Sequence, residues 1–156
     1  MVNMNSISHS VLNVDDLHES ARFYCDVLGG ERRSSVCFET EDTLRGRSVH
    51  ETYIVHDFVF FVALAERPLP KPPADQHRGL NGFRNGFFVS KTAFAETMEK
   101  LKANGIPFEG PIDHPENGPF GQSLYFKDPS GNFLECLWRR DEETPAFEKP
   151  NFLGIG

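Results

Sequence analysis

The residue of this sequence that most needs a chemical explanation is Glu135. It lies in the stretch SLYFKDPSGNFLECLW, residues 123–138, where most of its neighbours are apolar or aromatic. Burying an unpaired carboxylate is costly, so such a group usually becomes neutral, pairs with a cation or binds a metal ion. Glu135 is therefore a candidate for an ion pair or for a metal site.

Histidine side chains supply further candidates, because imidazole acts as an acid, a base or a metal ligand near neutral pH. His50 lies in an expected strand and could serve as an acid or base if it lines a cleft, although a structural role is preferred. His114 lies in the turn-rich stretch DHPENGPFG, which could cover a cleft or simply expose the side chain. His18 is expected on the polar face of a helix, and His56 in a structural turn.

These residues must be positioned by elements that the apolar periodicity predicts in an order that occurs twice. The first copy consists of a strand, a helix and further strands: residues 7–14, Leu17–Leu28, Glu31–Glu39, Ser48–Val55 and Phe58–Ala65. The second copy has the same order: Arg84–Val89, Thr92–Ala103, and strands near Phe108, at Ser123–Phe126 and at Asn132–Trp138. Gly29-Gly30 and Asn104-Gly105 follow the two helices, as is typical of helix C-termini.

The repeat predicts an α+β fold of two β-α-β-β-β modules, with the helices outside and the open faces of the sheets around a cleft. Aligning Val14 with Val89 places His9 opposite Arg84, and Glu135 opposite Phe60 or Phe61. We expect a single domain made of module one (6–65), a polar, Pro-rich linker (66–82), module two (83–138) and a C-terminal tail (139–156).

Composition and charge exclude several classes of partner. The 156 residues, 38% of them apolar, can bury one sizeable core, and 16 basic against 23 acidic residues give a net charge of −7. This charge is spread along the chain, which disfavours nucleic acid or an anionic membrane as a partner. The longest apolar run, Phe58–Ala65, is too short to cross a bilayer. Three cysteines without CxxC spacing indicate a cytoplasmic protein.

Two stretches near the ends of the chain resemble a known superfamily. The opening ISHSVLNVDDLHESARFYCDVLGG and the closing LYFKDPSGNFLE are similar to the first and last motifs of vicinal oxygen chelate proteins, the glyoxalase, bleomycin resistance protein and extradiol dioxygenase family. With the helix FAETMEKLKANGIPFEG the resemblance covers most of residues 6–138. It implies two β-α-β-β-β modules, a half-closed mixed sheet and a homodimer.

The resemblance also implies a metal site, because enzymes of this superfamily hold a divalent ion, here Fe, Mn, Ni or Zn, that chelates adjacent oxygens of a small-molecule substrate. His9 and Glu135 match the ligands of the first and last strands. Arg84, however, stands where three-ligand members have a second histidine, and a guanidinium has no lone pair to donate. Arg84 would instead pair with Glu135 or bind a substrate carboxylate or phosphate, and His77 of the linker could replace the missing ligand or be solvated.

Other residues of the motifs have expected supporting roles. Tyr125 matches a tyrosine that is common in the superfamily, and its phenol could hydrogen-bond a substrate or simply reach the surface. Residues 128–132, the DPSGN turn, are expected to position Glu135. Phe60 and Phe61 leave the fourth metal-ligand position apolar, so glyoxalase I activity itself is not expected.

The first functional hypothesis is a metal-dependent, dioxygenase-like or glyoxalase/lyase-like enzyme that acts on a small molecule with adjacent oxygens. The alternative is a metal-free small-molecule binding or resistance protein of the bleomycin-resistance type, with Arg84 as the anchor for an anion. A fosfomycin-type thiol transferase is less favoured, because Val11 and Arg84 replace the hydroxyl residue and the metal histidine of those proteins. A homodimer is expected, because the end strands and the apolar tail would otherwise stay uncovered.

Overall fold

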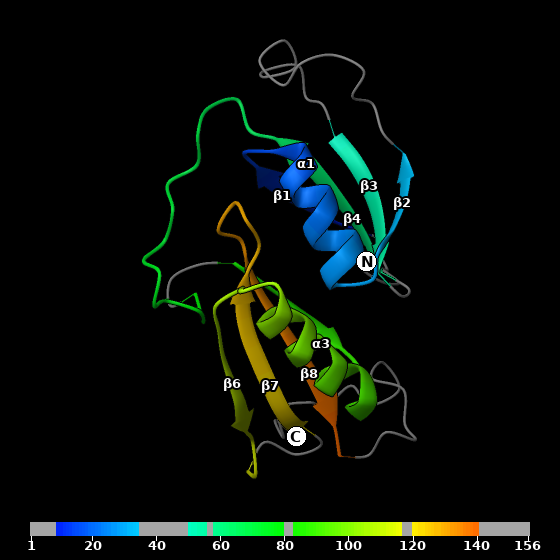
Figure 1. Ribbon diagram of the computed structural model, residues 1–156, viewed down its shortest axis with the longest axis vertical. Coiled ribbons are helices and arrows are strands. Elements are labelled where there is room, and N and C mark those ends of the chain that lie inside the picture. Colours follow the sequence, from blue (N-terminus) through cyan, green and yellow to red (C-terminus); the bar gives the residue numbers. More distant parts are fainter. Residues whose placement is uncertain (1–8, 35–49, 56–57, 80–82, 117–119, 141–156) are drawn as a thin grey trace, which may run out of the picture. The chain divides into compact units, whose positions relative to one another are not determined.

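The computed structural model describes residues 9–34, 50–55, 58–79, 83–116 and 120–140, which form two compact units (Figure 1). Unit 1 comprises the chain up to Lys71 together with Asp128–Asn132, and unit 2 comprises Pro72–Lys127 and the chain from Phe133 onward. Each unit contains one four-stranded sheet with a helix packed on one face. The prediction of two β-α-β-β-β modules in an α+β fold is confirmed.

Unit 1 places its strands in the order β1-β4-β3-β2. Strand β1 runs parallel to β4, and the other neighbouring strands are antiparallel. The elements of this unit are β1 (His9–Val14), α1 (Leu17–Arg22), the π-helical turn η1 (Phe23–Val27), β2 (Glu31–Ser34), β3 (His50–Val55) and β4 (Phe58–Leu64). The predicted strand Glu31–Glu39 is described only as far as Ser34, and the turn at His56 lies outside the described residues.

The helix of unit 1 begins and ends where the sequence indicates. Asp16 is the N-cap, and its carboxylate accepts a hydrogen bond from the Glu19 amide at 2.8 Å. After η1 the chain turns at Gly29, whose φ of 70° suits glycine. The next residue, Gly30, is also a glycine. A Cβ at this position would lie 2.7 Å from the Tyr24 carbonyl oxygen, so no larger residue fits beside the helix.

Unit 2 repeats the arrangement with the strand order β5-β8-β7-β6. Its helix is capped by Ser90, ends before Gly105, whose φ is 64°, and packs on β8 with Phe94 and Leu101 buried. The elements are β5 (Arg84–Phe88), α3 (Lys91–Ala103), β6 (Phe108–Asp113), β7 (Phe120–Lys127) and β8 (Phe133–Arg139). Strand β5 is parallel to β8, and the others are antiparallel.

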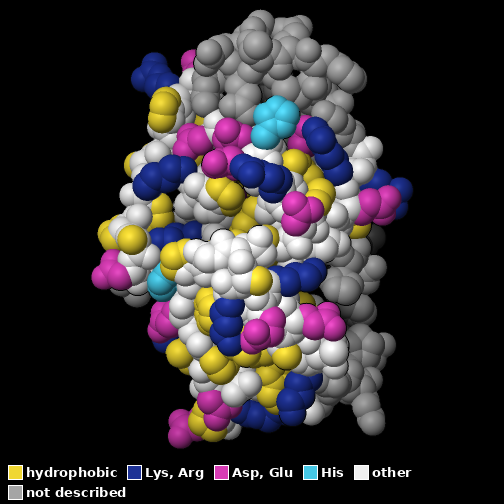
Figure 2. Space-filling view, in the orientation of Figure 1, with side chains coloured by type: hydrophobic (Ala, Val, Ile, Leu, Met, Phe, Trp, Pro, Cys, Tyr) yellow, Lys and Arg dark blue, Asp and Glu magenta, His cyan; other side chains and the backbone are white. Residues whose placement is uncertain are grey.

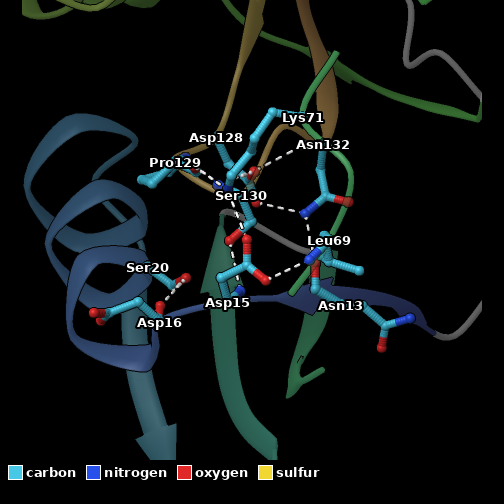
Figure 3. A network of polar contacts seen from close by, with 10 residues as sticks. All are labelled: Asn13, Asp15, Asp16, Ser20, Leu69, Lys71, Asp128, Pro129, Ser130 and Asn132. Carbon is cyan, nitrogen blue, oxygen red and sulfur yellow. Dashed lines mark hydrogen bonds and ion pairs between the residues drawn. The ribbon is translucent and has the colours of Figure 1, made fainter. Parts of the chain in front are cut away.

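The turn between β7 and β8 is held within unit 1 (Figure 3). Inside the turn, the Asp128 carboxylate accepts hydrogen bonds from the amides of Ser130 and Asn132 at 2.9 and 2.8 Å. Ser130 Oγ accepts one from the Asp15 amide at 2.9 Å, and Tyr24 donates its hydroxyl to Asp128 at 2.9 Å. Burial raises the pKa of Asp128. The DPSGN sequence therefore forms a tight turn and also a buried polar contact with the strand–helix junction of unit 1.

The Pro-rich segment (66–82), which runs from unit 1 into unit 2, is fixed to the structure at several points. In unit 1, the Leu69 amide and Lys71 Nζ both donate to the carboxylate of Asp15, at 2.8 and 2.7 Å (Figure 3). In unit 2, Lys127 Nζ donates to the Pro73 carbonyl oxygen at 2.6 Å. Further along, Arg78 Nη2 lies 2.5 Å from Glu109 Oε1. The segment is therefore a connection whose two halves each bind their own unit.

The surface drawn in Figure 2 carries acidic and basic side chains side by side, with apolar side chains between them. Such a mixed surface has no extended region of a single charge on the face drawn, in keeping with the charge pattern of the sequence. Among the described residues, no helix has the length and apolar character needed to cross a membrane.

Candidate functional site

The open face of the unit 2 sheet brings together the polar side chains of three strands. Across this sheet Glu135 of β8 pairs with Gly86 of β5 on one side and with Tyr125 of β7 on the other. Because side chains alternate along a strand, Leu134 and Cys136 are buried in the core while Glu135 lies on the opposite face. Gly86 carries no side chain beside it, and a Cβ at this position would lie 3.8 Å from Glu135 Oε2.

Both oxygens of Glu135 are occupied. Ser123 Oγ donates to Oε1 at 2.6 Å, and Arg84 Nε lies 2.9 Å from Oε2. The Glu135 side chain is 12% exposed, and the Arg84 side chain is 34% exposed. A charge at this depth is tolerated because it has a cationic partner and a hydrogen-bond donor, which accounts for the carboxylate among apolar neighbours.

Two guanidinium groups lie against the ring of Tyr125. The Arg84 guanidinium carbon is 4.8 Å from the ring centroid, and that of Arg78 is 5.1 Å from it. Arg84 Nη1 also donates to the backbone oxygen of Arg78 at 2.6 Å. Tyr125 is buried, and its pKa is raised first by burial and then by the charge of Glu135. The phenol therefore keeps its proton and serves as a platform for the arginines.

His114 joins this group through Ser123. Its Nε2 lies 2.9 Å from Ser123 Oγ, so His114, Ser123 and Glu135 form a continuous chain of hydrogen bonds. The sequence pattern places His114 in a loop, and Ser123 is a site residue that sequence reasoning misses. Ser123 lies two residues before Tyr125 on β7, and this spacing indicates that the two side chains share a face. The position of His114 depends on a bulge in β6 that periodicity does not predict.

A pocket of about 330 Å³ lies over this polar group, entirely within unit 2. Its walls combine apolar side chains with the polar chain just described: Phe88, Phe120 and Leu137 with His114, Ser123, Tyr125 and Glu135. The rings of Phe88 and Phe120 are nearly parallel, at 8°, with centroids 6.1 Å apart. The volume is at the lower end of the range for ligand pockets, which suits a small molecule with an apolar body.

The other expected site residues lie elsewhere or are only partly described. His9 is exposed on β1 of unit 1, with its ring edge-on to Phe61 at 4.7 Å. His50 belongs to β3 and pairs with Ala63, but its side chain lies outside the described part of the structure. His77 belongs to unit 2, where its Nδ1 is buried and has no hydrogen-bond partner among the described residues. Unit 2 thus brings together Arg84, Tyr125 and Glu135.

The residues around Glu135 do not fit a divalent metal ion. One oxygen of Glu135 is paired with the Arg84 guanidinium and the other accepts a hydrogen bond from Ser123, so a metal ion would have to compete with Arg84 for the carboxylate. The guanidinium would also repel a dication at this place. Among the residues that the structure describes, no group of three or more His, Cys, Asp or Glu side chains is placed to hold a metal.

Comparison with known proteins identifies the family. The model of the Glyoxalase/Bleomycin resistance protein/Dioxygenase superfamily matches residues 6–136, and the chain belongs to this superfamily. The resemblance inferred from the two end motifs is thereby confirmed. The virulence protein STM3117 of Salmonella typhimurium is 27% identical over 135 residues, which cover 85% of this chain and 83% of that protein.

Solved structures share the fold at low identity. A glyoxylase/bleomycin resistance protein/dioxygenase domain from Frankia sp. EAN1pec has a TM-score of 0.69 at 20% identity, covering 89% of this chain and 95% of that one. The fosfomycin resistance protein FosX of Listeria monocytogenes has a TM-score of 0.65 at 19% identity, covering 90% and 98%. A FosX variant, with a TM-score of 0.64 at 20% identity and 90% and 97% coverage, was solved with Mn(II) and dihydroxypropylphosphonic acid.

Proposed function

We propose that this protein binds a small molecule in the unit 2 pocket without a resident metal ion, and that Arg84 anchors an anionic group of that molecule. The observation that carries the proposal is the Arg84–Glu135 ion pair, with Nε 2.9 Å from Oε2. In the superfamily pattern both positions belong to metal ligands, and here a cation of the chain itself neutralises the carboxylate. The function is thus the metal-free binding type found within this superfamily.

Arg84 retains the capacity to bind a ligand. A guanidinium has five N–H donors, and the contacts of Arg84 use Nε toward Glu135 and Nη1 toward the Arg78 carbonyl oxygen. The remaining donors can form a bidentate contact with a carboxylate or phosphonate. The phosphonate carried by the ligand of the FosX variant is an anion of this type.

The walls of the pocket favour a ligand with an aromatic or other flat apolar body. Phe88, Phe120 and Leu137 supply apolar lining, and the flat rings of the two phenylalanines suit contact with a flat apolar group. The polar groups lie together at one end, around Glu135. A ligand with an apolar body and one charged end matches this division.

Calorimetric titration of EDTA-treated protein with hydrocinnamate and with its neutral amide tests the proposal. Hydrocinnamate should bind more tightly than the amide, and Arg84→Gln should weaken its binding by about 2 kcal/mol, or roughly thirtyfold, because a charged hydrogen bond is lost. Arg67→Gln removes an exposed arginine of unit 1 and should leave the affinity unchanged. Equal binding of the acid and the amide would contradict a role for Arg84 as anchor.

Metal analysis tests the opposite possibility, that the protein holds a resident metal ion. The protein is loaded in turn with Fe, Mn, Ni and Zn, and the bound metal is measured before and after His9→Ala and Glu135→Ala. Stoichiometric metal that is lost in both variants would overturn the proposal and favour a metal-dependent dioxygenase or lyase acting on adjacent oxygens. Metal contents that stay negligible in all three proteins support metal-free binding.

A further inference from the structure

At the polar end of the unit 2 pocket, the lining residue Glu135 is paired with the guanidinium of Arg84. Arg84 and Glu135 are 2.9 Å apart, and the neighbouring Arg78 and Glu109 form a second pair at 2.5 Å. These four charges sum to zero. A ligand that is only an anion, bound to the remaining donors of Arg84, would bring a second negative charge close to Glu135, which costs binding energy in a partly buried site.

The hydrogen bonds around Glu135 define what a ligand must offer to it. Ser123 has a single hydroxyl proton and donates it to Glu135, so the Nε2 atom of His114 must carry a proton and donate to Ser123. Glu135, which lines the pocket, can therefore meet a ligand only as an acceptor. The ligand group that faces Glu135 has to be a donor, and Gly86, the cross-strand neighbour, adds no side chain beside the carboxylate.

Charge and hydrogen-bond direction together select one chemical class. A carboxylate placed next to an ammonium group can replace the Arg84–Glu135 contact, with the carboxylate on Arg84 and the ammonium on Glu135. An α-amino acid has these two groups on one carbon. The stacked rings of Phe88 and Phe120, with Leu137, then receive an aromatic side chain, and a pocket of about 330 Å³ suits a molecule of this size.

We propose that the ligand of this pocket is an aromatic α-amino acid, bound as a zwitterion between Arg84 and Glu135. The inference rests on the proposed function, since it uses the same pocket and the same arginine. It adds the donor group that faces Glu135 and thereby names the ligand class.

The test compares four probes that share a phenyl ring, titrated calorimetrically into EDTA-treated protein. L-phenylalanine has both charges, hydrocinnamate lacks the ammonium, phenethylamine lacks the carboxylate and phenyllactate replaces the ammonium with a hydroxyl. L-phenylalanine should bind at least about tenfold more tightly than any of the other three, because each of them leaves Arg84 or Glu135 without its charged partner. Phenyllactate that binds as tightly as L-phenylalanine would overturn the ammonium assignment.

Glu135→Gln separates a lost ligand contact from a misfolded pocket. This variant should weaken L-phenylalanine by about tenfold or more, while hydrocinnamate binds as well as before or better, because a repulsive charge has been removed. Arg84→Gln should weaken both ligands. Glu99→Gln, which removes an exposed carboxylate on α3, should change neither.

The outcomes distinguish this inference from the proposed function. If hydrocinnamate binds in an Arg84-dependent manner and L-phenylalanine binds no better, the anion anchor is supported and the amino-acid inference is overturned. If no probe binds, or if binding is independent of Arg84, both proposals fall. A parallel loss of both ligands in Glu135→Gln would likewise overturn the inference, since only the ammonium contact should depend on the charge of Glu135.

Discussion

The two units share a strand order and a helix position, yet each places its main carboxylate–arginine pair on a different face of its sheet. In unit 1 the carboxylate is Glu51, which is fully buried and bonded by Arg32 and by the hydroxyl of Tyr53. In unit 2 it is Glu135, which faces the pocket and pairs with Arg84. The same backbone therefore supports a buried structural ion pair in one unit and an accessible one in the other.

The strand register shows how small the underlying sequence difference is. Val11 pairs with Phe61 in unit 1 as Gly86 pairs with Glu135 in unit 2, so Phe61 is the residue equivalent to Glu135. Two residues earlier on each strand, His9 pairs with Val59 and Arg84 pairs with Phe133, so His9 is the residue equivalent to Arg84. A fold repeated within one chain thus becomes chemically asymmetric through a few side chains on the open faces.

The largest expected effect is the loss of the buried pair of unit 1. Glu51→Ala should lower the free energy of unfolding by about 2–3 kcal/mol, because the Tyr53 hydroxyl loses its acceptor in the core while the partly exposed Arg32 can be rehydrated. Glu135→Gln should cost about 1 kcal/mol or less, since Arg84 is near solvent. Urea unfolding of both variants measures the difference, and equal losses would show that the two pairs are alike.

A smaller effect should appear in the pH dependence of stability through Asp128. Burial raises its pKa, so the folded state holds this proton more tightly than the unfolded state does. The contribution to stability is then full below the unfolded pKa and is lost as pH rises through the raised folded pKa. The free energy of unfolding of wild type minus that of Asp128→Asn should therefore fall with rising pH. Urea unfolding across this pH range measures it, and a difference that grows with pH would mean that the folded pKa is lowered.

The smallest effect concerns a feature that both units share. Gly29 and Gly105 end the two helices with φ values of 70° and 64°, and a Cβ at either position would meet open space. Gly29→Ala and Gly105→Ala should each cost about 1 kcal/mol, because an L-residue is strained in this conformation. Thermal or urea denaturation should give nearly equal losses.

Asparagine at the same two positions provides the control for backbone strain. Asparagine adopts the left-handed conformation more readily than alanine, so Gly29→Asn and Gly105→Asn should each lose less stability than the alanine variant. A loss confined to one unit would show that the two helix ends are packed differently.

The order of the elements could be predicted from the sequence because it depends on local signals. Apolar periodicity places both helices within a few residues of their observed bounds, and the glycines after them mark their ends. The DPSGN motif predicts a turn stabilised by its own aspartate, which Asp128 provides. These features can be predicted from the sequence because each depends on residues that are close together in the chain.

The polar contacts could be predicted only in part, because they join residues that are distant in sequence. Arg84 is recognisable as a possible partner of Glu135 through the alignment of the two modules. The burial of Glu51 is not among the predictions. Glu51, Tyr53 and Val55 are every second residue of β3, however, and this spacing places Glu51 on the same core face as the other two. The contact of His114 with Ser123 follows from the bulge between Glu109 and Ile112, which no periodicity reveals.

The membership of the Asp128–Asn132 turn in unit 1 has a consequence for how the chain can be divided. The polypeptide passes between the units after Lys71, and again on each side of this turn. A gene split after Lys71 would therefore produce a first fragment without Ser130 and Asp128, which accept hydrogen bonds from the Asp15 amide and the Tyr24 hydroxyl, and a second fragment with its β-hairpin tip unpartnered. Neither fragment would keep all the contacts of its unit, so a single cut in the chain cannot separate the two repeated units.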